Sequence, residues 1–152
     1  MLTRGMIYRN MAEMYVELNI SVEEALRYTT VAETDLKEAV RHFSEFVKEP
    51  IREVQARNEM ACCQRARYLF LRASAAMKNE QDMAVVQGRA YFRQAIELAH
   101  QQNYIVDELD SMQDLAVLLT RAEQYDDAER YLNVIRSKIP EQYVIRSGHG
   151  LV

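Results

Sequence analysis

The sequence predicts an all-α protein, and three observations lead to that expectation. Apolar residues recur in steps of three and four along most of the 152-residue chain, which is the spacing of one helix face. No segment shows the alternation of apolar and polar residues that marks a half-buried strand. Glycine occurs four times and proline twice, too seldom for the many turns of a β-sandwich. We therefore expect six or seven helices, joined by short connections and stacked as antiparallel hairpins.

The first helix is expected at residues 3–18, and the next begins at residue 21. Apolar residues at helical spacing define the first one: Tyr8, Met11, Ala12, Tyr15 and Leu18. Asn19 tolerates the left-handed conformation that ends many helices. Ser21 and Glu24 form an S-x-x-E capping box, which marks a helix start. The pattern then continues to Lys48 without a breaker, so that 21–48 is either one helix or two.

Pro50 marks the start of a third helical region, because proline is tolerated in the first turn of a helix. One long helix is expected over 51–77. The polar turn KNEQD follows, and Asn79 within it is a candidate N-cap. Another helix is expected over 80–102. It contains Gly88, which costs about 1 kcal/mol relative to alanine in a helix and therefore indicates close backbone packing.

The segment MQDLAVLLTRAEQYDDAERYLNVIRSKIP, residues 112–140, predicts two helices joined by a tight turn. Tyr125 opens the second helix and Pro140 stops it. Both helices place small and large apolar residues on a shared packing face: Leu115, Ala116 and Leu119 in the first, Ala128, Leu132 and Ile135 in the second. Small residues allow two helices to approach closely, and the larger ones fill the space beside them.

This pattern resembles the tetratricopeptide repeat (TPR), a helix–turn–helix unit. Ala25, Gly88 and Ala128 are the corresponding small residues, at irregular separations. The resemblance covers about 10–33 and 58–140, with longer helices than the consensus repeat. It implies a right-handed superhelix of antiparallel hairpins that acts as a binding scaffold. In TPR proteins the first helix of each pair lines a concave groove, which receives a peptide or a partner helix.

We expect residues 1–140 to form one TPR-like helical repeat domain. The remainder, residues 141–152, has no helical face and is expected to be an irregular C-terminal tail. Solenoids usually finish with a polar capping repeat, and none is evident in this sequence. We therefore expect either a chain cut from a longer multidomain protein or a partner over the open end. A second copy of the chain, joined through uncapped repeat ends, is one such partner.

Composition narrows the choice of partners and compartment. The net charge of −4 argues against nucleic-acid binding, which normally needs a basic domain or face. No run of the roughly 18 apolar residues that a membrane span requires is present. Cys62 and Cys63 are adjacent and cannot close an undistorted disulfide if they lie on a helix. We expect both to be small buried thiols, in keeping with a reducing cytoplasm.

No motif for catalysis is recognisable. The sequence has no glycine-rich phosphate loop and no H-E-x-x-H, C-x-x-C or G-x-S-x-G element, and its three histidines lie far apart. We therefore expect a non-enzyme without cofactor or metal. Two acidic pairs at i,i+4 spacing are expected on solvated helix surface: Glu13 with Glu17, and Asp110 with Asp114. Most methionines and tyrosines are expected in the core, including Met11, Met14, Tyr15, Tyr125 and Tyr131.

One basic stripe is the candidate binding site. Arg57, Arg65, Tyr68 and Arg72 follow helical steps along the 51–77 region, with alanines between them. If they line the concave groove, their guanidinium groups suit an acidic peptide, because arginine pairs bidentately with carboxylates. The alternative is a packing surface, in which the arginine stems cover apolar neighbours while the charged heads reach solvent.

These expectations favour a non-catalytic protein-interaction module that binds a peptide or a partner protein, as part of a larger regulator or signalling scaffold. The alternative is a sensor domain that binds a small molecule or signal peptide within the helical array. An open groove would favour the first function, and an enclosed cavity lined by polar groups would favour the second.

Overall fold

The computed structural model describes residues 1–139, and every regular element within them is helical. Six α-helices follow one another: α1 (Leu2–Glu17), α2 (Val22–Arg41), α3 (Pro50–Ala73), α4 (Lys78–Gln101), α5 (Ile105–Arg121) and α6 (Tyr125–Lys138). A π-helical turn, η1 (His42–Phe46), continues α2. The predicted all-α class and helix number are thereby confirmed. The tail expected at 141–152 lies outside the described residues.

The helical segments that precede α6 end on left-handed residues that are not glycine. Five such residues have φ between 51° and 62°: Asn19, Lys48, Ala75, Asn103 and Glu123. After α1, the amide of Ile20 donates to the carbonyl of Tyr15 at 2.9 Å, and the ends of α3, α4 and α5 have the matching bond, as in a Schellman cap. After η1 the corresponding bond spans one residue more, from the amide of Glu49 to the carbonyl of Phe43 at 3.0 Å. The left-handed conformation predicted for Asn19 is confirmed. This is how six helices are joined in a chain with only four glycines.

Two helix boundaries differ from the sequence prediction. The region 51–77 was expected to be helical throughout, but α3 ends at Ala73 because Ala75 adopts φ 54°. The predicted N-cap at Asn79 is wrong, since α4 begins at Lys78 with Met77 as its N-cap. By contrast, the Ser21 cap is confirmed: its Oγ accepts a hydrogen bond from the amide of Glu24 at 3.2 Å.

Within the region 21–48, α2 and η1 form one continuous helical stretch from Val22 to Phe46. Arg41, the last residue of α2, runs directly into η1 without leaving the helical region of backbone space. The stretch closes where the amide of Val47 donates to the carbonyl of His42 at 3.0 Å. Pro50 then begins α3, as predicted, at a position where its missing N–H costs no helical bond.

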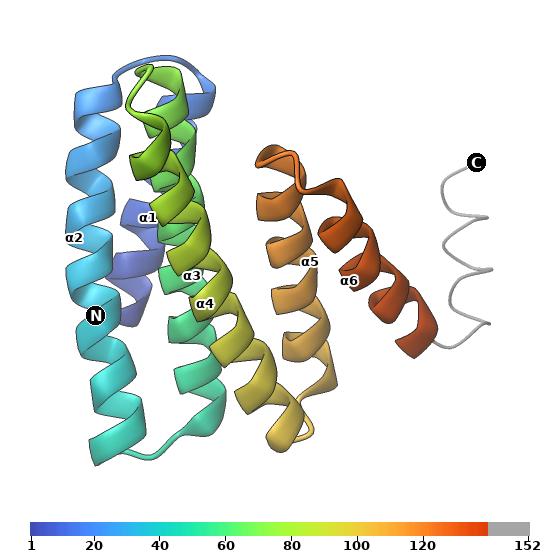
Figure 1. Ribbon diagram of the computed structural model, residues 1–152. Coiled ribbons are helices and arrows are strands. Elements are labelled where there is room, and N and C mark those ends of the chain that lie inside the picture. The colour runs from blue at the N-terminus through green and yellow to red at the C-terminus, as the bar shows by residue number, and fades with distance from the viewer. Residues whose placement is uncertain (140–152) are drawn as a thin grey trace, which may run out of the picture.

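Consecutive helices pack against one another along the chain, and α3 is central because it also contacts α1 and α5. Figure 1 shows the blue N-terminal helices at one end and α5 and α6 at the other. Among the described helices, α6 packs against α5, and it reaches α4 through one ion pair, Arg89–Asp127 at 3.0 Å. The first helices of the three hairpins, α1, α3 and α5, are thus neighbours in series, and their shared side carries most of the charged contacts described below.

Small residues mark the close helix crossings. Ala25, Gly88 and Ala128 are all buried, as the repeat register predicts. A Cβ added to Gly88 would lie 2.9 Å from Leu118 Cδ2 and 3.1 Å from Gln64 Cβ, which confirms that close approach of α4 to α3 and α5 accounts for this glycine. Leu132, expected on the same packing face as Ala128, is 44% exposed.

Several side chains expected in the core are on the surface. Met14 and Tyr125 are exposed, whereas Met11, Tyr15 and Tyr131 are half-buried. Leu132 and Tyr125 lie on α6, and among the described helices only α5 packs against α6. Met14 lies on the side of α1 that faces away from the core, where it forms part of the apolar stripe described below.

Candidate functional site

A network of charged side chains joins the three first helices. Arg9 on α1 donates to Glu59 on α3 at 2.8 Å and to Glu13 on its own helix at 3.0 Å. Arg65 on α3 donates to Glu13 at 3.0 Å and to Asp114 on α5 at 3.2 Å. Alternating guanidinium and carboxylate groups therefore run from α1 across α3 to α5.

Burial makes this network more than a set of surface ion pairs. The side chain of Arg65 is only 11% exposed, and that of Glu59 is similarly buried. Burial raises the pKa of Glu59, although the guanidinium of Arg9 opposes that shift. Burial also disfavours the charge on Arg65, but the negative groups around it prevail and raise its pKa. Each charge is retained in the interior because an opposite charge lies beside it.

The candidate stripe on α3 is divided between separate contacts. Arg65 belongs to the buried network. The hydroxyl of Tyr68 and a guanidinium nitrogen of Arg72 both donate to the backbone carbonyl of Arg121, at 3.1 Å and 2.9 Å. Tyr68 is buried, and Arg72 is exposed.

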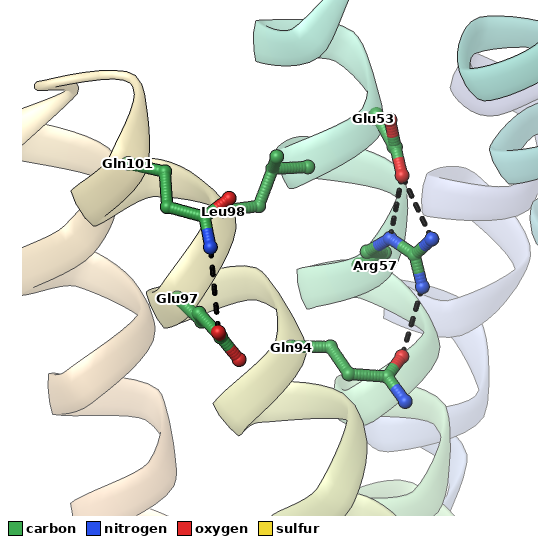
Figure 2. Close-up of a pocket in the computed structure, with 6 residues that line it drawn as sticks. All are labelled: Glu53, Arg57, Gln94, Glu97, Leu98 and Gln101. Atoms are coloured by element: carbon green, nitrogen blue, oxygen red, sulfur yellow. Dashed lines mark hydrogen bonds and ion pairs between the residues drawn. The ribbon is translucent and has the colours of Figure 1, made fainter.

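Arg57, the fourth member, lies in a shallow pocket between α3 and α4. Figure 2 shows its guanidinium between Glu53, at 2.7 Å, and the side-chain oxygen of Gln94, at 2.8 Å. The stripe therefore does not form a row of free cations. Its role in binding an acidic peptide stays a prediction, for which only Arg57 and Arg72 offer accessible surface.

Sequence reasoning missed the carboxylates of this network. Glu13 and Asp114 were expected on solvated helix surface, yet both pair with Arg65, and Glu13 is mostly buried. The only local signal was the Arg9–Glu13 pair at i,i+4 spacing. The partners of Arg65 come from helices 52 and 49 residues away in sequence, so no local pattern identifies them.

The two cysteines behave as core residues. Cys62 and Cys63 are free and buried, as predicted. Burial raises the pKa of each thiol, well above its usual range in the case of Cys62. Because the thiolate is the reactive form, neither side chain is placed to act as a nucleophile.

A cavity of about 400 Å³ opens between α1, α3 and α5, beside the ion network. Met6 and Val54 form apolar parts of its wall, and Asn58 and Glu59 line it from α3. From α5 it receives two carboxylates and a hydroxyl: Asp107, Asp110 and Ser111. Its lining is rich in hydrogen-bond acceptors, and Arg52 is its one cationic side chain.

An apolar groove lies on the outer side of the first hairpin. Ile7, Met14 and Leu18 are 53%, 54% and 63% exposed, and half-buried Met11 completes a stripe with spacing of four, three and four. The groove beside this stripe has a volume of about 490 Å³ and is formed with Tyr28 and Val31 of α2. Tyr28 is held in place by a stacked contact to Tyr8 at 5.7 Å between ring centroids.

Residues 1–139 hold neither a metal-binding cluster nor a membrane-spanning helix. They contain no group of three or more histidine, cysteine or acidic side chains arranged to hold a metal ion. None of the helices there has the length and apolarity needed to cross a membrane. Comparison of the chain with protein-family models, with curated protein sequences and with solved structures finds no match.

Proposed function

We propose that this chain is a non-catalytic protein-interaction module whose docking surface is the outer apolar stripe of α1. The stripe consists of Ile7, Met11, Met14 and Leu18. Three of these four side chains are more than half exposed. Large apolar side chains gathered in one exposed row are typical of interaction sites, whereas scattered ones need no explanation.

The distribution of apolar residues around α1 carries this proposal. Its core face is occupied by small residues, including the fully buried Ala12 and the buried Gly5. The outer stripe lies on the opposite side of the same helix. A helix that is apolar on two sides is normally covered on both, and the second side of α1 leaves Ile7, Met14 and Leu18 more than half exposed.

The spacing of the stripe identifies the kind of partner. Steps of four, three and four are those of a coiled-coil seam, which receives an amphipathic helix. Methionine supplies two of the four side chains, and its flexible thioether adapts to a partner surface. Arg4 and Arg27 stand at the edge of the groove with mostly exposed side chains, and each is paired with a carboxylate of this chain, Asp35 and Glu24 respectively.

The remaining features of the proposal rest on the resemblance and on the interior chemistry. A TPR-like array of hairpins is supported by the serial contacts of α1, α3 and α5 and by the small residues at the crossings. A non-catalytic role is supported by the pairing of the interior charges with each other. Placement in a reducing cytoplasm, within a larger regulator or signalling scaffold, completes the proposal, and the two free thiols support that compartment.

Site-specific photo-crosslinking in the producing cell tests this function. A photoreactive amino acid at position 14 should yield a discrete protein adduct, whereas the same group at exposed Glu129 on α6 should not. Ile7→Glu combined with Leu18→Glu should abolish the adduct without lowering the melting temperature, because both side chains are already exposed. An adduct of twice the chain mass would identify a second copy as the partner. No adduct at position 14, or equal adducts from both positions, would refute the proposal.

A sensor function is the second candidate, and the cavity between α1, α3 and α5 favours it. The cavity is lined by polar groups from α3 and α5, which is the arrangement expected of a ligand site within a helical array.

A further inference from the structure

Two carboxylates of the cavity between α1, α3 and α5 stand outside the ion network of the described residues. Arg9 and Arg65 pair with Glu13, Glu59 and Asp114, and no ion pair of the described residues includes Asp107 or Asp110. Asp107 lies in the first turn of α5, where the helix dipole favours a negative charge. Asp110 lies beyond that turn and has no such role.

The surroundings of Asp110 disfavour its negative charge when no ligand is bound. Asp110 is exposed as a residue, yet partial desolvation of its carboxyl raises its pKa, and the neighbouring charges of Asp107 and Asp114 raise it further. A nearby cation would remove that cost. Arg52, the one cation of the lining, is exposed at the rim and bonds to Gln55 at 3.4 Å rather than to Asp110.

Two polar side chains of the cavity also have hydrogen-bonding capacity that no described residue uses. Ser111 is only 2% exposed, and its hydroxyl makes no hydrogen bond to any described residue. The side-chain oxygen of Asn58 is buried without a partner, although the amide nitrogen of the same side chain donates to Asp114 at 3.0 Å. Most buried polar groups are paired. The buried, unpaired oxygen of Asn58 in this acidic cavity points to a missing donor.

We propose that this cavity binds the ammonium or guanidinium group of an organic cation, which donates hydrogen bonds to Asp110, Ser111 and Asn58. Such a cation carries several N–H donors, so it can donate hydrogen bonds to acceptors on two different helices. A metal ion would need ligands converging at short distance, and residues 1–139 offer no such group. Met6 and Val54 supply apolar wall against which an alkyl chain can pack.

The cation can come from a free polyamine-like molecule or from an arginine or lysine side chain of a partner protein, and the chemistry at the cavity is the same. This assignment does not depend on the docking surface of α1, which lies on the other side of that helix. A failure of either proposal therefore leaves the other standing.

Nuclear magnetic resonance titration of the isotope-labelled full chain tests the proposal. The probes are agmatine, spermidine and a capped arginine peptide, with the matching capped citrulline peptide as a neutral control of the same shape. The cations should shift the resonances of Asn58, Asp110 and Ser111, and citrulline should not. Tighter binding of the peptide than of the free amines would identify a partner side chain as the source, and the reverse would identify a small molecule.

Three variants separate binding from folding. Asp110→Asn should weaken cation binding by about tenfold or more, as expected for loss of a charge-assisted hydrogen bond. Arg52→Gln should tighten it, because a competing positive charge is removed, and misfolding cannot mimic a gain. Asp126→Asn, an exposed acidic control on α6, should change nothing. Equal shifts with citrulline, no shifts with any probe, or binding that is unchanged in both Asp110→Asn and Arg52→Gln would overturn the proposal.

Discussion

Arg65 connects three helices through one guanidinium group, since it bonds to Glu13 on α1 and Asp114 on α5. Removing one partner of a buried ion pair lowers the stability of the fold by more than the intact pair contributes, because the remaining charge is left uncompensated. We therefore expect Arg65→Met to lower the free energy of unfolding by about 3 kcal/mol, measured by urea denaturation. Arg72→Met, on the same helix but exposed, is the control and should cost less than about 1 kcal/mol. Equal losses would mean that the network is not buried in solution.

Asp110 should make the protein less stable at neutral pH than it would be without that charge. Its pKa is raised in the folded state by burial and by the charges of Asp107 and Asp114, so the folded protein holds a proton there more tightly than the unfolded chain does. Stability therefore rises as pH falls through the folded pKa, and the difference is complete below the ordinary carboxyl pKa of about 4.

Asp110→Asn tests this pH dependence. The variant should have a higher melting temperature than the parent at pH 7, because it removes a disfavoured charge. The advantage should disappear near pH 3, where the parent carboxyl is itself neutral. A variant that is less stable at pH 7 would show that the carboxylate has a favourable partner in solution. The same substitution is expected to weaken cation binding, as occurs when a site stores unfavourable interactions for a ligand.

At the scale of the helices, the left-handed residues at their ends carry a conformational cost. A non-glycine residue in this region is disfavoured by about 1–2 kcal/mol, and glycine is not. Glu123, at φ 62°, and Ala75, at φ 54°, have neither glycine's freedom nor the local bonding of asparagine.

Glu123→Gly and Ala75→Gly should each raise the free energy of unfolding by about 0.5–1 kcal/mol, after allowance for the greater freedom of glycine in the unfolded chain. Asn19→Gly should gain less, because asparagine tolerates φ 51°. Ala76→Gly, one residue beyond Ala75, should instead destabilise. The measurement is urea unfolding of the four variants, and a loss of stability in both Glu123→Gly and Ala75→Gly would contradict the assigned turn geometry.

The helices were predictable because helical periodicity is local. The Ser21 cap, the Asn19 end and the Pro50 start each depend on a few adjacent residues, and all three are confirmed. The end of α3 was not predictable, because Ala75 carries no signal for a left-handed conformation. The same limit applies to Met14: its spacing identifies a helix face, but neighbouring helices decide which face is buried.

At the scale of the whole molecule, sequence patterns could place the stripe on α3 but not its partners. The residues that bond to Arg65 lie 52 and 49 positions away, and only the packing of α1, α3 and α5 brings them together. The candidate cavity is even harder to predict from the sequence. In the sequence, its acidic side chains on α5 look like ordinary helix surface. They indicate a ligand site only beside the unpaired oxygen of Asn58 and the buried Ser111, and tertiary packing decides both of these features.

The unequal burial of the helices predicts a gradient of local stability across the molecule. Eleven residues of α3 are buried, and α3 contacts four other α-helices. In α6 only Ala128 is buried, and among the described helices α6 packs against α5 alone, with one ion pair to Arg89 of α4. Local opening requires the loss of few contacts in α6 and of nearly all contacts in α3.

Native-state hydrogen exchange, read helix by helix, measures this gradient. We expect the amides of α3 to exchange only through global unfolding, and those of α6 to exchange through local opening at a much smaller free energy. Ala128→Gly should speed exchange in α6 further and leave α3 unchanged when the urea concentration is set for equal global stability. If the amides of α6 were as well protected from exchange as those of α3 at low protein concentration, the predicted low local stability of α6 would be wrong. Protection that rises with protein concentration would show that another copy covers its exposed face.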